Sequence, residues 1–186
     1  MSDASSPPPP ATPLVWLLRS HPEAAEDYLE FRWVVARIAA RLAAERATPE
    51  DMQRITAAFQ RLEQAHDDQR LDEEMAADIA FHRAIYRATH NAVMHHIMER
   101  LLGLLGDDVF YDRAAFYRHG ETRADLMDQH RALYQALARK DAAGAVTAAE
   151  SHIRYTGKAL RQWRTAQARR SVARRRAGRI GADEEA

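Results

Sequence analysis

A carboxylate and an imidazole lie one helical turn apart in the stretch DIAFHRAIYRATHN, residues 78–91. The spacing of Phe81 and Ile85 predicts a helix, and its apolar side would also carry Asp78 and His82. A carboxylate in a core is costly unless it has a cationic partner, hydrogen bonds, a proton or a metal. The pair therefore indicates either a hydrogen-bonded Asp–His pair or part of a ligand site.

Two further histidines occupy apolar helix faces. His130 stands on a stripe with Leu126 and Leu133, and His152 stands on one with Ala149. A single histidine on an apolar face is more often a satisfied core residue than a ligand. Three such helices could nevertheless converge at the centre of a bundle, where bundles build metal sites. Imidazole and carboxylate ligands suit zinc, nickel, cobalt, iron or manganese.

The remaining histidines are not assigned to a site. Adjacent His95 and His96 point about 100° apart on a helix, so both cannot face the centre. His66, His90 and His119 lie near predicted helix ends, where we expect surface roles.

The elements that would position these side chains are predicted to be helices, because apolar residues recur with a period near 3.6 and no stretch alternates for long. The predicted helices cover residues 23–46, 48–66, 71–90, 91–105 and 121–140, with a last one from Asp141 onward. The expected fold is all-α, an antiparallel bundle of six to seven helices joined by short connections.

Composition agrees with a single helical domain. Hydrophobic residues make up 46% of 186 residues, Gly and Pro number only 7 each, and cysteine is absent. Residues 1–13 are Pro-rich and are expected to form a disordered arm. We expect the bundle at 14–165 and an Arg-rich helix end and tail at 166–186. With no apolar run of about 20 residues and no signal peptide, a cytoplasmic protein without membrane contact is expected.

Positive charge is concentrated near the C-terminus. Seven arginines fall between Arg164 and Arg179 with no acid among them. Such a run can be a nucleic-acid patch. It can also be a solvated helix end that complements the helix dipole.

Several motifs together resemble a known family. These are D-x-x-F-H at residues 78–82, H-N at 90–91, H-x-x-L-x-x-A at 130–136, K-D-x-x-x-A at 140–145, and His152. They are similar to the effector-binding FCD domain of FadR-type GntR transcription regulators. The lead-in at 13–32 resembles the branch of pyruvate dehydrogenase complex repressors, near the lactate-responsive repressors.

The resemblance implies a helical bundle that holds a divalent transition metal such as zinc, nickel or manganese. Its ligands would be Asp78, His82, His130 and His152. It also implies a homodimer and a small carboxylate effector, such as pyruvate or lactate, which fills open metal positions. Arg32 would meet the effector carboxylate; its alternative role is a surface salt bridge. Asn91 would be a second effector residue or simply a helix cap.

This chain departs from the family pattern at two points. Members commonly carry Glu four residues after the arginine, where this chain has Ala36. The family's DNA-binding winged helix is not expected within residues 1–186, so operator binding through a winged helix would need a domain outside them. Two other functions stay open: a metal-dependent, hydrolase-like enzyme, and a metal-free helical interaction domain.

Overall fold

A computed structural model describes residues 16, 20–21, 24–106 and 120–183. The Pro-rich arm, the aromatic stretch 110–117 and His119 lie outside these residues. The described part contains six helices and no strand, as expected for an all-α bundle. The helices are α2 (Ala24–Arg46), α3 (Pro49–Asp67), α4 (Leu71–Ala88), α5 (Ala92–Gly106), α7 (Gly120–Ala138) and α8 (Ala142–Asp183).

Local sequence explains where the helices begin and end. The Thr48 hydroxyl accepts a hydrogen bond from the Asp51 backbone N–H, and the Asp51 carboxylate accepts one from the Thr48 N–H, which forms a capping box before α3. Three connections are three residues long, after α3, α4 and α7. The central residue of each is left-handed: Gln69 (φ 56°), His90 (φ 53°) and Lys140 (φ 54°). These short links make successive helices antiparallel.

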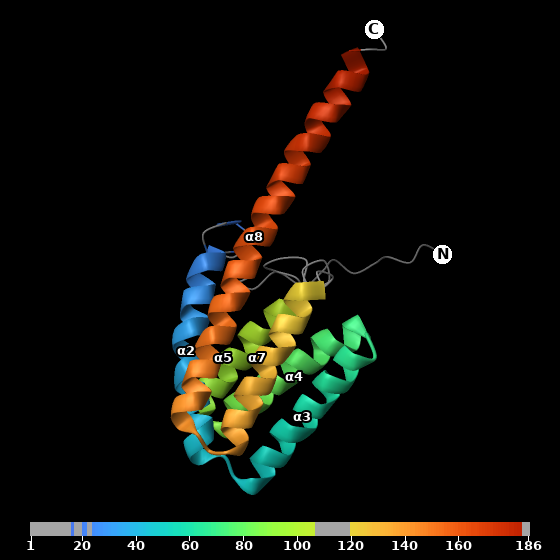
Figure 1. Ribbon diagram of the computed structural model, residues 1–186. Coiled ribbons are helices and arrows are strands. Elements are labelled where there is room, and N and C mark those ends of the chain that lie inside the picture. Colours follow the sequence, from blue (N-terminus) through green and yellow to red (C-terminus); the bar gives the residue numbers. More distant parts are fainter. Residues whose placement is uncertain (1–15, 17–19, 22–23, 107–119, 184–186) are drawn as a thin grey trace, which may run out of the picture.

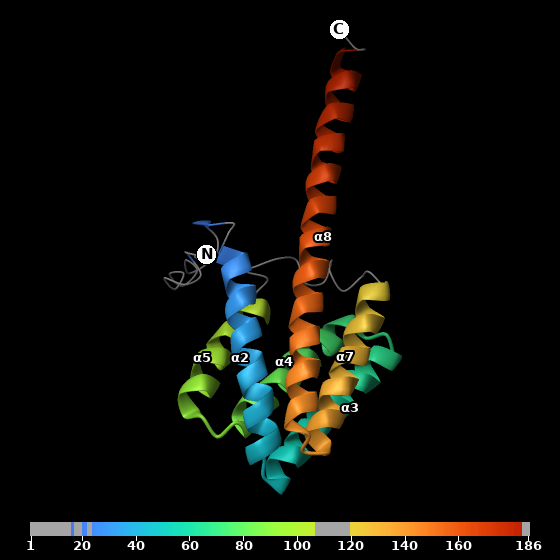
Figure 2. The ribbon, with the colours of Figure 1, turned by 60° about the vertical axis from the view of Figure 1, so that its left-hand side comes forward.

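The helices pack as a bundle at one end of the molecule (Figure 1). Helix α8 lies between α2 and α7, and α4 packs against α2, α3 and α5 (Figure 2). Small residues of α2, including Ala40, Ala43 and Ala44, lie in the main core beside Phe81 and Leu137. Because alanine side chains are short, the helix backbones approach closely, and polar groups on α4, α7 and α8 can meet across the core.

None of the described helices combines the length and apolar character needed to cross a bilayer. Helix α8 is 42 residues long and extends well beyond the bundle (Figures 1 and 2).

Candidate metal centre

Three helices bring the predicted ligands together. Asp78 and His82 lie one turn apart on α4, His130 lies on α7 and His152 on α8. All four are buried, with exposed fractions of 7%, 7%, 2% and 5% in that order. Their neighbours along each helix are core residues, so the same periodicity that buries Phe81 also turns these polar groups inward.

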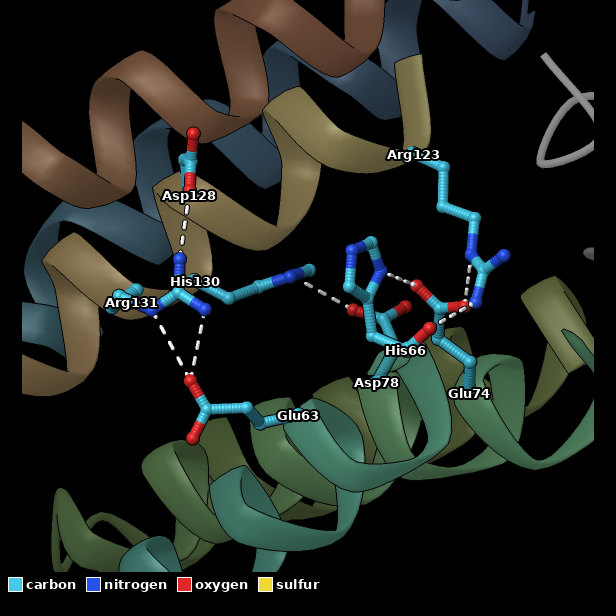
Figure 3. Close-up of polar contacts among 8 residues, drawn as sticks. All are labelled: Glu63, His66, Glu74, Asp78, Arg123, Asp128, His130 and Arg131. Carbon is cyan, nitrogen blue, oxygen red and sulfur yellow. Dashed lines mark hydrogen bonds and ion pairs between the residues drawn. The ribbon is translucent and has the colours of Figure 1, made fainter. Parts of the chain in front are cut away.

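The ring nitrogens and the carboxylate oxygen are close together. One candidate ligand nitrogen from each of the three imidazoles lies within 4.8 Å of the others. The Oδ1 atom of Asp78 is 2.9 Å from Nε2 of His130 and 3.4 Å from Nε2 of His82. Figure 3 shows His130 reaching from α7 toward Asp78 on α4. Ligands bound at about 2.1 Å to one ion lie roughly 3–4 Å apart, so small side-chain shifts would complete a site.

Two ring nitrogens of these histidines are buried without a hydrogen bond. Among the described residues, Nε2 of His130 and Nδ1 of His152 have no hydrogen-bond partner. Although His130 approaches Asp78 to 2.9 Å, the direction of contact does not suit a hydrogen bond. Buried polar atoms are nearly always satisfied, and an ion is one of the partners that can satisfy them.

The electrostatics favour neutral imidazoles at His82 and His152. Burial lowers the pKa of His82, and this effect is partly opposed by the interaction with Asp78. Burial lowers the pKa of His152 well below its usual value, and the neighbouring His130 and His82 act in the same direction. A neutral imidazole keeps a lone pair for a metal, so the donor set fits a divalent transition metal.

Arg32 is buried beside this centre. Its exposed fraction is 4%, which excludes the surface salt bridge considered from the sequence. It lies on α2, with its guanidinium carbon 5.8 Å from the centre of the Tyr28 ring. Its positive charge is close enough to add to the lowering of the His82 and His152 pKa values by burial. A buried cation near the cluster is suited to attract an anionic ligand.

A small cavity of about 10 Å³ adjoins His82 and His152. This volume is close to the minimum that holds one water molecule. Ala36 contributes to its wall, at the position where the family commonly carries a glutamate. The remaining lining is mostly apolar: Ala39, Ala40, Ile85, Tyr86, Leu133, Ala149 and Ile153.

Asn91 acts as a helix cap. Its side-chain oxygen accepts a hydrogen bond of 3.0 Å from the Met94 backbone N–H at the start of α5. This geometry agrees with the capping role considered from the sequence. A role for Asn91 in effector binding stays a prediction.

The acids next to the histidines in sequence face away from them. Asp128 is mostly exposed and pairs with Arg131 at 2.8 Å, and Glu150 pairs with Arg154 at 2.8 Å. Neither acid therefore shares an inward stripe with His130 or His152.

A second buried cluster was missed from the sequence. Glu74, 2% exposed, is hydrogen-bonded to His66 at 2.8 Å and to the Arg123 guanidinium (Figure 3). Arg123 also donates to the His66 backbone carbonyl at 2.8 Å. The surface role expected for His66 was wrong, because its side chain is only 22% exposed and is held by Glu74. The available signal was that Glu74 lies four residues before Asp78, on the same helix face.

Comparison with known proteins identifies the class. The FCD domain family model matches residues 27–155, so the chain belongs to the FCD domain family. The chain is 31% identical over 157 residues to a putative regulatory protein of the L-lactate dehydrogenase operon from Escherichia coli K12. That match covers 84% of this chain and 59% of the relative, so the chain spans less than two thirds of the relative's length.

Solved structures agree on the fold. A GntR-family regulator from Pseudomonas syringae pv. tomato has a TM-score of 0.67 at 19% identity, covering 81% of this chain and 60% of its own. The Escherichia coli protein McbR/YncC has a TM-score of 0.61 at 20% identity, covering 74% and 65%. The described bundle thus shares the fold of these GntR-family regulators over the matched part of each chain.

Proposed function

We propose that this domain senses a small carboxylate with the help of a bound divalent metal. The observation that carries the proposal is the convergence of Asp78, His82, His130 and His152, with two ring nitrogens that lack hydrogen bonds among the described residues. A metal held there would supply coordination positions for an oxygen ligand. The buried guanidinium of Arg32 would orient the carboxylate and offset its charge.

The surroundings favour a short effector. The cavity beside His82 and His152 is small and its wall is mainly apolar. A two- or three-carbon acid such as pyruvate or lactate requires the least displacement of Ala36 and its neighbours. The relative named for an L-lactate dehydrogenase operon supports the same chemical class.

We also propose that the domain forms a homodimer through α2 and α5. Exposed apolar residues recur on α2 at Phe31, Val34 and Ile38, and on α5 at Val93 and Ile97. Both helices contribute residues to one buried cluster, and we propose that their exposed apolar residues form one surface. Such surfaces in soluble proteins are typical of interfaces, and two-fold pairing of identical chains is the commonest arrangement.

The effector proposal can be tested on this chain by thermal shift. Metal-loaded protein should be stabilised by pyruvate or lactate more than by longer mono- and dicarboxylates. Arg32→Lys should lose that effector shift while retaining metal, whereas Arg37→Lys on the same helix should keep both. Equal shifts in the two variants would contradict the role of Arg32.

The dimer is tested separately by sedimentation. Ile38→Glu should convert dimers into monomers, because it places a charge in the apolar surface. Glu45→Lys, an exposed change on the same helix, is the control. A wild-type monomer at micromolar concentration would contradict the dimer.

A further inference from the structure

Beyond Trp163, no residue of α8 belongs to the hydrophobic core clusters of the described chain. Trp163 is the last residue of α8 packed against a core cluster, the one formed by Leu29, Leu126 and Leu160. From Thr165 to Val172, every side chain that the structure describes is exposed. The helix then continues to Asp183, and Figures 1 and 2 show it leading away from the bundle. Residues 164–183, the α8 extension, span roughly 30 Å at 1.5 Å per residue.

Charge is segregated between the bundle and this extension. The residues before Arg164 include 20 basic and 24 acidic side chains, whereas Arg164–Arg179 contains seven arginines and no acid. Arginines four positions apart, such as Arg170 and Arg174, repel one another on a helix. An unpacked helix is marginally stable in water. A polyanion would therefore stabilise the extension as well as bind it.

The distribution of arginines around the helix indicates which kind of polyanion the extension can bind. With a 100° step, the seven arginine positions are distributed over most of the circumference. The uncharged strip between them carries mainly small residues, Ala166, Ala173 and Ala177. A membrane-surface helix needs a large apolar side, and a coiled coil needs large apolar residues with a heptad repeat. Neither pattern is present in residues 164–183.

Double-stranded DNA fits this distribution of charge. Its major groove, about 12 Å wide, admits one α-helix and presents phosphates along both walls. The major groove of an RNA duplex is too narrow and deep for side chains to read. We propose that the α8 extension binds double-stranded DNA through its phosphate backbone, without sequence specificity. This nucleic-acid contact is independent of the metal centre and of any effector.

The test compares two variants that remove the same charge from the full chain. The extension variant replaces five arginines by glutamine: Arg169, Arg170, Arg174, Arg175 and Arg176. The matched control replaces five exposed bundle arginines by glutamine: Arg41, Arg61, Arg87, Arg100 and Arg139. Fluorescence anisotropy then measures binding to a labelled duplex of about 25 base pairs across the range of roughly 50 to 200 mM salt. Circular dichroism checks that both variants fold.

The extension variant should bind at least about tenfold more weakly than wild type at the lowest salt concentration, and the control should change less than about threefold. The slope of log affinity against log salt should flatten by about 0.9 for each phosphate that the variant no longer neutralises. DNA should also raise the helical signal of wild type but not of the extension variant.

Other results would overturn the proposal. They include no duplex binding by wild type at the lowest salt concentration, equal reductions of affinity in both variants, and tighter binding to single-stranded RNA or to anionic vesicles than to the duplex. If the extension variant alone loses its dimers while its DNA affinity is unchanged, the DNA proposal is contradicted. The extension would then be assigned to self-association.

Discussion

Two buried carboxylates on α4, one helical turn apart, have different surroundings. Glu74 pairs with the Arg123 guanidinium and the His66 ring, and Arg123 also binds a backbone carbonyl (Figure 3). Asp78 lies among three imidazoles, and two of these have nitrogens without hydrogen bonds in the described chain. In the first cluster the carboxylate is paired with protein donors, whereas the second contains buried ring nitrogens without hydrogen bonds among the described residues.

We propose that this difference separates a structural polar cluster from a metal-binding one. Burying an ionised carboxylate is tolerated when a cation and hydrogen bonds accompany it, as for Glu74. In the second cluster, a bound metal would add positive charge between Asp78 and the neutral imidazoles. Burial alone therefore does not distinguish the proposed metal centre from the Glu74 cluster. The two differ in the ring nitrogens of His130 and His152, which are buried without a hydrogen-bond partner among the described residues.

The largest effect is expected from His130→Ala. It removes one ligand, so metal affinity should fall by at least about 100-fold. The metal-linked stabilisation, about 2.7 kcal/mol at a metal concentration about 100 times Kd, should nearly disappear. Metal analysis and thermal melts with and without metal measure both effects. His66→Ala, in the Glu74 cluster, should lose stability yet bind metal normally. Equal loss of metal in the His130→Ala and His66→Ala variants would contradict the difference between the two clusters.

A smaller effect is expected from Glu74→Gln. The Arg123 guanidinium would then face a neutral amide at position 74 instead of a carboxylate. The loss of this ion pair should reduce the free energy of unfolding by about 2–3 kcal/mol. Metal content should be unchanged. Denaturant unfolding of the metal-free protein and elemental analysis measure these quantities. A stability change below about 0.5 kcal/mol would mean that the pair contributes little.

Acid should destabilise the metal-free protein through the histidine cluster. The folded-state pKa values of His82 and His152 lie below the usual imidazole value of about 6.5. As pH falls through about 6.5, the unfolded chain binds protons that the folded chain does not, so the free energy of unfolding decreases. Urea unfolding about one pH unit above and one below this value measures the loss. His152→Leu should show a shallower dependence; an identical one would contradict the assignment.

The smallest effect on stability is expected from Thr48→Ala, in a capping box whose polar groups are paired within the protein. Thr48→Ala removes the side-chain half of the capping box before α3 and should cost about 1 kcal/mol, with metal content unchanged. The partner Asp51 keeps its 2.7 Å hydrogen bond to His90. Thermal unfolding and metal analysis of this variant together check that the capping box affects stability but not metal binding.

Local signals predicted much of this fold. The Thr48–Asp51 sequence marks the start of α3, and the periodicity around Phe81 and His130 predicts which helix faces are inward. The convergence of Asp78, His82, His130 and His152 was predicted because these polar residues interrupt apolar stripes and because the motifs around them resemble the FCD family. Their role as metal ligands stays a prediction. The pairing of Glu74 with Arg123 was not predicted, because it joins residues 49 positions apart whose contact depends on tertiary packing.

The central claim is that four side chains hold one metal ion, and anomalous X-ray scattering tests it most directly. Crystals grown with zinc, measured on both sides of the zinc absorption edge, should show one buried anomalous peak. That peak should lie about 2.0–2.2 Å from nitrogens of His82, His130 and His152 and from an oxygen of Asp78. Fully formed crystals with no anomalous density among these residues, or with zinc only at surface histidines such as His96, would contradict the claim.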